Sequence, residues 1–272
     1  MTTEPVVIYN LTKRIVYNRV PKTGSRVVEE LLSSMSKRHH YTYILSNSYL
    51  DFKPSEIKLQ EQISQLQAKK APWLFDRHIY FFHFPNENST TEAPLYVNII
   101  RDPIDRCISW YYFIRFEHPR NMSEGRRSKS FDACLEEKLD ECTEFYEPPY
   151  RCLQIPFICG QDPICVNNSR EALQKAKRNV VKKYAVVGLT EDMRSFVRVI
   201  EKVVPHFFEG ALQVYDKYGA KNQLRYSNSK HKTHSLYSSM KMEKFMSLEI
   251  EFYKFVRDYF YRRYKHILGT FN

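Results

Sequence analysis

Short apolar runs of the kind found in buried strands alternate along this chain with stretches that have helical spacing. The runs predict strands at residues 14–20, 41–45, 73–82, 95–100 and 184–188. Apolar residues recurring at helical intervals predict helices at 25–38, 54–70, 104–116, 170–183, 190–204 and 236–266. Thr190 is the predicted N-cap of the helix that reaches Val204. Strands that alternate with helices are typical of a mostly parallel sheet covered by helices. We therefore predict an α/β fold.

Composition supports one folded domain over residues 1–272. The chain is 43% hydrophobic and 15% aromatic, which is enough apolar surface for one substantial core. It has only seven glycines, no internal repeat and no low-complexity tract, which argues against a solenoid or a linker-rich chain. No compelling domain boundary interrupts the pattern, so a single domain is expected.

The formal charge of +11 indicates a polyanionic partner. Nucleic acid, an anionic membrane and an acidic polysaccharide all meet that condition, and a basic pI kept for solubility is the alternative without a partner. The sequence has no zinc-finger spacing, RRM core or helix-turn-helix pattern. Nucleic acid is therefore not expected, and an acidic polysaccharide is the favoured partner.

The six cysteines favour disulfides over metal binding. Two local pairs, Cys134–Cys142 and Cys159–Cys165, lack the C-x-x-C spacing of zinc or dithiol redox sites. Short loops of this kind are readily closed by disulfides in an oxidising compartment. Cys107 and Cys152 have no obvious short-range partner, and we expect them to be free. The competing interpretation is a cytosolic protein with six free thiols.

Four N-x-[ST] sequons agree with passage through the secretory route. They lie at Asn10, Asn88, Asn121 and Asn167. The chain shows no signal peptide and no apolar span of eighteen residues, so targeting to that route would need a segment before Met1. We expect the natural protein to begin earlier than this chain.

The turn at residues 21–25, Pro-Lys-Thr-Gly-Ser, connects the first predicted strand to the first helix. A sharp strand-to-helix turn presents unpaired backbone N–H groups at the positive end of a helix dipole, and this geometry binds phosphate. Lys22 adds a mobile positive charge, Thr23 and Ser25 add hydroxyl groups, and Gly24 permits close approach of the backbone. The loop G-x-x-x-x-G-K-[ST] of nucleoside-triphosphate enzymes is not matched, because Lys22 precedes the glycine. A P-loop-like kinase would also need a distant strand-end aspartate, for which the sequence offers no convincing candidate.

A second phosphate site is predicted where the 95–100 strand ends. Arg101 follows this strand and Ser109 lies eight residues further on, so an arginine fork and a hydroxyl can grip one phosphate. Ligands collect at the carboxyl ends of strands in open α/β sheets, and Lys22, His78 and Arg101 lie at or near such ends. A nucleotide with phosphates at two ends suits this arrangement, and 3′-phosphoadenosine 5′-phosphosulfate is such a molecule.

These residues resemble the motifs of Golgi sulfotransferases, and more narrowly those of the 2-O-sulfotransferases of uronic acids in glycosaminoglycans. The matching stretches are residues 17–22, 74–78, 98–103, 154–160, 187–191 and 251–253. The resemblance implies a P-loop-like sulfotransferase fold with a central, mostly parallel sheet flanked by helices. It implies transfer of the sulfonate of 3′-phosphoadenosine 5′-phosphosulfate to a 2-hydroxyl group, without a metal ion. It also implies a type II membrane protein of the Golgi lumen that assembles as a homotrimer.

The resemblance assigns roles to individual residues. His78 is the expected general base, and Lys22 is expected to neutralise charge on the leaving phosphate. The expected donor contacts are the 5′ set Lys22, Thr23, Gly24, Ser25 and Arg26, the 3′ pair Arg101 and Ser109, and Leu224 and Arg225 in a covering segment. Arginines pair with carboxylates and sulfates, and aromatic faces pack on sugar rings. The expected acceptor contacts are Arg19, Trp110, Tyr111, Arg115, Arg120, Arg126 and Arg127. The alternatives are a core role for one of the two aromatic residues and a solvated loop for the basic residues within 117–130.

The acceptor stays open between branches of this family. Heparan enzymes carry a His-x-His pair whose first histidine falls at Asp76, whereas Asp76-Arg77-His78 is closer to the uronyl 2-O-sulfotransferases of dermatan and chondroitin sulfate. The insect Pipe proteins belong to the same branch, so sulfation of glycoprotein glycans is an alternative. A non-catalytic polyanion-binding protein is another. Asp76 itself is expected either to orient the imidazole or to cap the strand.

Overall fold

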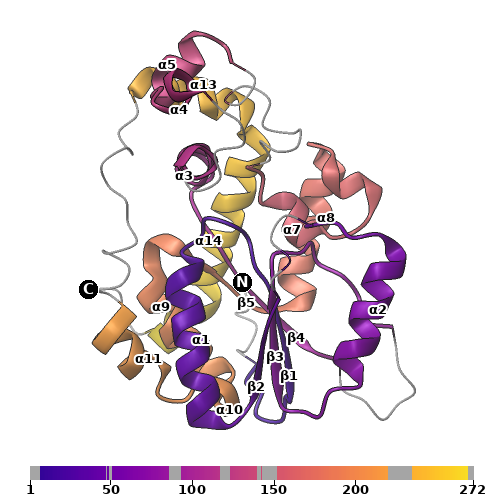
Figure 1. The fold of residues 1–272 in the computed structure, drawn as a ribbon. Coiled ribbons are helices and arrows are strands. Elements are labelled where there is room, and N and C mark those ends of the chain that lie inside the picture. The colour runs from indigo at the N-terminus through magenta and orange to yellow at the C-terminus, as the bar shows by residue number, and fades with distance from the viewer. Residues whose placement is uncertain are drawn as a thin grey trace.

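The computed structural model describes residues 7–46, 48, 51–85, 93–116, 123–139, 142, 152–219 and 235–268. Within these residues the core is a parallel sheet of five strands in the spatial order β2-β3-β1-β4-β5 (Figure 1). The strands are β1 (Arg14–Asn18), β2 (Thr42–Leu45), β3 (Trp73–Arg77), β4 (Leu95–Ile100) and β5 (Tyr184–Leu189). Because β1 pairs in parallel with both β3 and β4, the carboxyl ends of these three strands meet at one edge. The predicted α/β fold class is confirmed.

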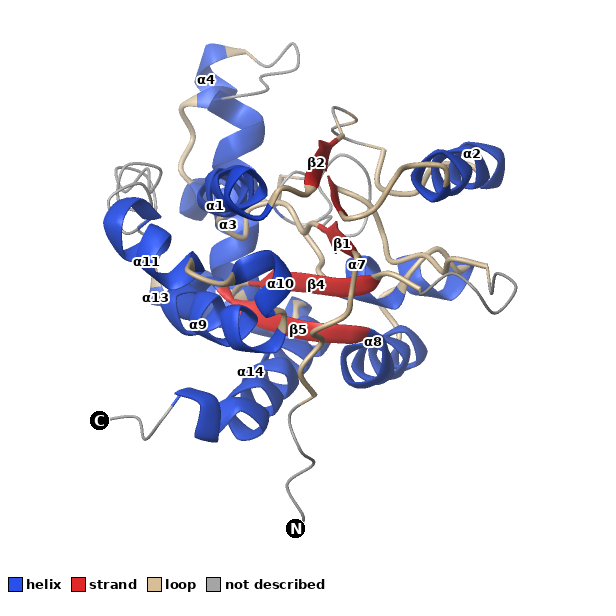
Figure 2. Cartoon of the chain, turned by 90° about the horizontal axis from the view of Figure 1, so that it is seen from below, coloured by secondary structure: helices blue, strands red, loops and turns tan. Residues whose placement is uncertain are grey.

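Helices cover both faces of this sheet (Figures 1 and 2). One face carries α1 (Ser25–His39), α9 (Met193–Val203), α10 (Pro205–Phe208) and α11 (Ala211–Val214). The other carries α2 (Glu56–Gln67), α7 (Ile155–Cys159), the 3-10 turn η1 (Pro163–Val166) and α8 (Arg170–Lys183). The long helix α14 (Ser247–Leu268) contributes Phe252 to the second apolar cluster and Phe260 to the first. It therefore joins the two cores.

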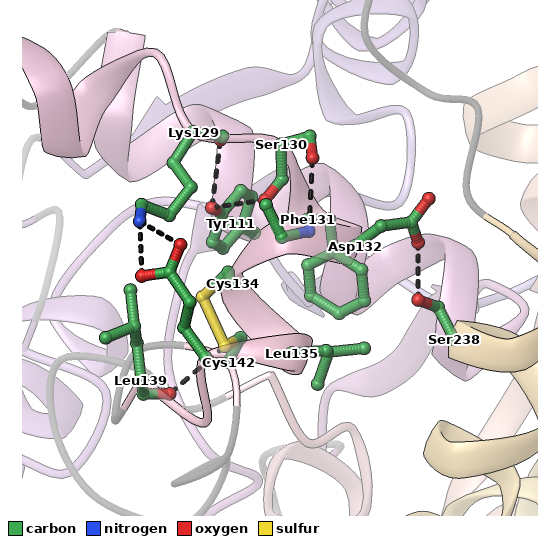
Figure 3. Close-up of a disulfide and its surroundings, with 12 residues drawn as sticks. Tyr111, Lys129, Ser130, Phe131, Asp132, Cys134, Leu135, Leu139, Cys142 and Ser238 are labelled. Carbon is green, nitrogen blue, oxygen red and sulfur yellow. Dashed lines mark hydrogen bonds and ion pairs between the residues drawn. A yellow bond between two sulfur atoms is a disulfide. The ribbon is translucent and has the colours of Figure 1, made fainter.

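A third apolar cluster lies beyond the carboxyl ends of the strands, and we call the helices around it the upper lobe. These are α3 (Pro103–Phe116), α4 (Glu124–Arg127), α5 (Phe131–Glu136) and α13 (Leu236–Phe245), at the top of Figure 1. Asp132 of α5 accepts hydrogen bonds from the backbone N–H of Ser235, at 3.0 Å, and from the hydroxyl of Ser238 (Figure 3). These contacts tie α5 to α13 across about a hundred residues of sequence.

The predicted elements differ from the observed ones mainly at their ends. The strand predicted at 73–82 ends at Arg77, because the following backbone leaves the sheet: the Tyr80 N–H donates to the carbonyl of Phe52 in a loop, and the Phe81 N–H donates to the carbonyl of Phe157 in α7. The helix predicted at 236–266 is two helices, α13 and α14, separated at Met246. None of the described helices combines the length and the apolar character needed to cross a bilayer.

Thr190 is not the N-cap of α9, so that prediction is wrong. A 3-10 turn, η2 (Thr190–Asp192), precedes the helix, and the carboxylate of Asp192 accepts the N–H of Ser195 at 3.2 Å. The hydroxyl of Thr190 instead donates to the carbonyl of Ile100 at 3.1 Å. The side chain that reaches the orphan N–H groups of the first turn is the cap, and here that is Asp192.

Three disulfides link the described cysteines. Cys134–Cys142, shown in Figure 3, and Cys159–Cys165 are the two pairs that the spacing predicts. The prediction that Cys107 and Cys152 are free is wrong, because they form a third disulfide. The two cysteines are 45 residues apart, so no local spacing reveals them; the fold brings α3 against the segment before α7.

Removing the Cys107–Cys152 disulfide is expected to lower the free energy of unfolding more than removing a short-range one. In the chain-entropy model its 45-residue separation corresponds to about 4 kcal/mol, and the separation of 6 at Cys159–Cys165 to about 2 kcal/mol. Urea unfolding of the two double-alanine variants, Cys107→Ala/Cys152→Ala and Cys159→Ala/Cys165→Ala, measures the difference. Equal losses would show that constraint of the unfolded chain is not the main effect.

Candidate active site

The loop between β1 and α1 reverses direction in two left-handed steps. Lys22 has φ 67° and Gly24 has φ 80°. A Cβ at Gly24 would lie 3.2 Å from Cε of Met193, in addition to the backbone strain, so glycine is favoured there. The first turn of α1 contains no acidic residue, and its N-terminal N–H groups form the positive end of the helix dipole. The loop is therefore suited to an anionic group.

The side chains of this loop divide into buried and accessible ones. Thr23 is fully buried, and its hydroxyl donates to the carbonyl of Val20 at 2.8 Å. This corrects the expectation of a phosphate contact from that hydroxyl: Thr23 closes the turn, and its backbone N–H is its remaining group. Ser25 is half-buried and Arg26 is exposed at the start of α1. Lys22 is half-buried, with Nζ 4.2 Å from the ring centroid of Phe113 on α3.

Arg101 follows β4, the neighbour of β1 in the sheet, and reaches the same loop. Its Nη1 donates to the carbonyl of Lys22 at 3.4 Å. The side-chain amide of Gln154 holds the Arg101 backbone from both sides, accepting its N–H at 2.9 Å and donating to its carbonyl at 2.7 Å. Ser109 is half-buried on α3, two helical turns further on. The two predicted phosphate motifs are thus brought together.

His78 follows β3, the other neighbour of β1, and is only 3% exposed. Its Nδ1 is 3.0 Å from the carbonyl of Arg19. A carbonyl only accepts, so this contact assigns the proton to Nδ1 and the lone pair to Nε2. Burial lowers the pKa of His78 to about 3, and the charges of Arg19, Arg106 and Lys22 act in the same direction. The imidazole is therefore neutral near pH 7, with the Nε2 lone pair able to accept a hydrogen bond.

Asp76 contacts the side chain of Arg19, whose backbone carbonyl contacts His78. Its carboxylate is fully buried, accepts the hydroxyl of Tyr43 at 2.7 Å, and lies 3.2 Å from Nε of Arg19. Burial raises the pKa of Asp76 to about 6, although Arg19 and Tyr43 oppose the shift. Arg19 also forms an ion pair with Glu29 of α1. Asp76 thus holds the side chain of the residue whose carbonyl holds His78.

Several predicted acceptor contacts are buried. Arg19 is 4% exposed and engaged by two carboxylates, and Trp110 packs near Phe113 in the upper lobe. Arg115 is fully buried, 3.4 Å above the ring of Tyr111, itself buried. The prediction that these four residues line an acceptor surface is therefore corrected. Arg19 is paired with Asp76, and Trp110, Tyr111 and Arg115 are buried in the upper lobe.

The other predicted contacts have a simpler placement. On α4, Arg126 is exposed and Arg127 is half-buried. Arg120, Leu224 and Arg225 lie outside the described residues. Among the described residues, no group of three or more His, Cys, Asp or Glu side chains is arranged to hold a metal ion.

Sequence reasoning assigned no role to three buried polar residues behind the site. Arg106, Gln154 and Glu249 are each at most 1% exposed. The carboxylate of Glu249 accepts the N–H groups of Gln154 and Ile155 at the start of α7, at 2.9–3.0 Å. No local pattern marks Arg106 as buried, because it directly follows the charged Asp105.

This fold and site define a family. A family model described as the sulfotransferase family matches residues 6–266, and the chain belongs to that family. It is similar to human uronyl 2-sulfotransferase, with 32% identity over 221 residues, which is 78% of this chain and 53% of the relative. The mouse uronyl 2-sulfotransferase is 30% identical over 268 residues, 94% of this chain and 64% of the relative. Heparan sulfate 2-O-sulfotransferase 1 of Xenopus laevis is 34% identical over 258 residues, 90% of this chain and 70% of the relative. The chain thus spans between about half and two thirds of the length of the two uronyl relatives.

Proposed function

We propose that this chain transfers the sulfonate of 3′-phosphoadenosine 5′-phosphosulfate to the 2-hydroxyl of a uronic acid in a glycosaminoglycan of the dermatan or chondroitin type. The observation that carries the proposal is the meeting of Lys22, His78 and Arg101 at the ends of three adjacent strands, with His78 in the neutral tautomer that a general base needs. Both uronyl and heparan relatives modify the 2-position, in agreement with this assignment.

The residues present fit such a donor. The loop N–H groups of Thr23 to Arg26 and the Ser25 hydroxyl would hold the 5′ end, at a helix start without acidic side chains. Arg101 and Ser109 would hold the 3′-phosphate. When bound, the donor supplies an activated sulfonate on a phosphate leaving group. Leu224 and Arg225 remain proposed covering residues.

Two side chains carry the transfer in this proposal. Nε2 of His78 accepts the proton that the sugar hydroxyl loses as it attacks the sulfur atom. Lys22 places its charge at the oxygen that leaves with the phosphate. Neither proposed role uses a metal ion. No step of the proposed transfer requires the protonation state of Asp76 to change.

Acceptor selection is proposed to involve Arg126, Arg127 and Arg120, whose guanidinium groups match carboxylates and sulfates. Asp76 and Arg19 neutralise each other beside the base, which distinguishes this chain from heparan enzymes with a histidine at that position. We therefore favour a dermatan or chondroitin acceptor, with glycoprotein glycans as the alternative.

Transfer of labelled sulfate from the nucleotide to a panel of acceptors tests the function. The panel holds desulfated heparan, dermatan and chondroitin chains and a glycoprotein extract. Transfer to dermatan or chondroitin is expected. Transfer only to glycoprotein would favour a glycoprotein glycan as the acceptor, as in the Pipe-like alternative. Failure of the protein to bind adenosine 3′,5′-bisphosphate in calorimetry would refute the proposal that it is an enzyme using this donor.

The pKa of His78 leads to a pH prediction. Because its folded-state pKa of about 3 lies below the ordinary 6.5, its ring carbon and nitrogen NMR signals are expected to stay at neutral-form values between pH 5 and 8. Between the folded pKa of about 3 and the ordinary 6.5 the unfolded chain binds more protons at this site, so His78 contributes stability that grows as pH rises through this range and is fully present above it. The signals are assigned by difference from His78→Asn. A midpoint near 6.5 would contradict the assignment.

We propose a location in the Golgi lumen, with an N-terminal anchor and a trimeric assembly as in the heparan relatives implied by the resemblance. The exposure of the sequon residues Asn10 and Asn167 supports the secretory route. In secreting cells, Asn10→Gln and Asn167→Gln are each expected to remove one endoglycosidase-sensitive mobility step. A wild-type protein unaffected by the glycosidase would argue against this location, and light scattering tests the trimer.

A further inference from the structure

Arg106 lies at the end of the first turn of α3 and is completely buried. Its Nε donates a hydrogen bond to the carbonyl of Pro21 at 2.9 Å. Nη1 and Nη2 are also buried, and neither has a hydrogen-bond partner among the residues that the structure describes. Burying a guanidinium with two unpaired amino groups is costly, and an apolar residue would fill the same space without that cost. The position needs a reason other than packing.

Arg101 makes the matching contact one residue further along the phosphate loop, where its Nη1 donates to the carbonyl of Lys22. The Pro21 carbonyl belongs to the peptide unit before the Cα of Lys22, and the Lys22 carbonyl belongs to the unit after it. Each arginine therefore holds one of the two peptide planes that meet at Lys22. Together they restrict rotation about both soft backbone bonds of this residue.

Lys22 needs that restraint because its φ of 67° is unfavourable for a residue with a Cβ. Such a conformation persists only where its surroundings over-determine it. Gly24 reaches a similar φ without a side-chain penalty, whereas Lys22 must keep its side chain for the proposed chemistry. The hydrogen bonds from Arg106 and Arg101, on either side of Lys22, supply the restraint that the local sequence does not provide.

The charge of Arg106 is retained in its buried position. Burial lowers its pKa to about 10, and Glu249 of α14 opposes the shift, so the group stays protonated near neutral pH. Its charge is felt at His78, together with those of Arg19 and Lys22. The guanidinium of Arg106 therefore lies behind the loop and adds positive potential at His78.

We propose that Arg106 is a positioning residue for sulfonate transfer. It holds the Pro21 peptide, while Arg101 holds the peptide after Lys22. The restrained Lys22 then keeps its ammonium group where the leaving phosphate develops charge. The inference rests on the proposed function, because it gives Lys22 its task. It assigns Arg106 no contact with donor or acceptor.

Arg106→Met, which keeps bulk without charge or donor, and Arg106→Lys, which keeps the charge and one donor, test the role. Arg263→Met is the matched control, since Arg263 is a half-buried arginine stacked near Tyr259 and Tyr264 of α14. A small displacement of a reacting group costs up to about 100-fold, so kcat is expected to fall about 100-fold in Arg106→Met and about tenfold in Arg106→Lys. The control is expected to keep wild-type kcat at a similarly lowered melting temperature.

Amide hydrogen exchange gives a readout that needs no catalysis. Peptides covering residues 20–26 are expected to exchange faster in Arg106→Met than in wild type or Arg263→Met. Unchanged loop exchange, or a kcat within about twofold of wild type in folded Arg106→Met, would overturn the proposal. If Arg106→Met does not fold, wild-type kcat and loop exchange in Arg106→Lys would overturn it. Wild-type protein that binds no adenosine 3′,5′-bisphosphate would refute the proposed function instead. Amide exchange of the loop would still decide whether Arg106 restrains the loop.

Discussion

Replacing His78 by alanine is expected to lower kcat for sulfonate transfer by about 10²–10⁴-fold. The imidazole is neutral, and the Arg19 carbonyl directs its Nδ1 proton inward, so that Nε2 holds the lone pair. Without it, the attacking hydroxyl has no positioned base. Donor binding is expected to remain, because His78 is not among the proposed phosphate contacts. Initial rates at saturating donor and acceptor measure the loss, and calorimetry with adenosine 3′,5′-bisphosphate measures binding.

His83→Ala is the matched control for this experiment. His83 lies a few residues further on, is exposed, and packs edge-on against Phe81 at 4.8 Å. It is expected to leave kcat unchanged. A His78→Ala enzyme that keeps more than about a tenth of wild-type kcat would remove the histidine from the base role. Asp76→Asn separates the base from its support: it is expected to give a smaller loss, since the Arg19 carbonyl remains.

Replacing Lys22 by alanine is expected to lower kcat by about 10²–10³-fold, the range seen when one preorganised electrostatic contact to a developing anion is lost. Alanine has the same backbone restrictions as lysine at φ 67°, so the change removes the ammonium group without adding strain in the loop. Unlike His78→Ala, it is also expected to weaken binding of the product nucleotide, about tenfold, because a charged phosphate contact disappears.

Lys183→Ala, at an exposed lysine of α8, controls for the general loss of positive charge. Its kcat and nucleotide affinity are expected to match those of the wild type at the same ionic strength. If Lys22→Ala loses affinity but keeps kcat, the lysine binds the phosphate equally well before and during transfer, and its proposed role at the leaving oxygen is wrong.

Much of the frame was predictable from local pattern. Strand 95–100 and helix 170–183 have the predicted bounds, because a continuous apolar run and a 3.6-residue period are properties of short segments. The turn at residues 21–25 was recognisable for the same reason. The ends of elements were less predictable, as at Arg77 and Met246, where contacts with distant loops and helices replace the local preference.

Burial of charged and aromatic side chains was not predictable from local pattern. Arg19 looked like a surface arginine, but Asp76, from a strand paired with β1, and Glu29, one helix away, enclose it. Trp110 and Arg115 looked like ligand contacts, yet α3 turns both into the upper lobe. Whether such a side chain faces solvent depends on what the fold places over it.

By itself, the sequence determined the α/β class, since that depends on short-range patterns, and it predicted the phosphate turn, the pair Arg101 and Ser109, and, through the resemblance, the base candidate His78. Only the tertiary structure decided the strand order that puts β1 between β3 and β4, the Cys107–Cys152 disulfide, and the two arginines that flank Lys22. These features join residues 45 to 85 positions apart. Contacts at that separation depend on how complete elements pack, and a local pattern carries no information on it.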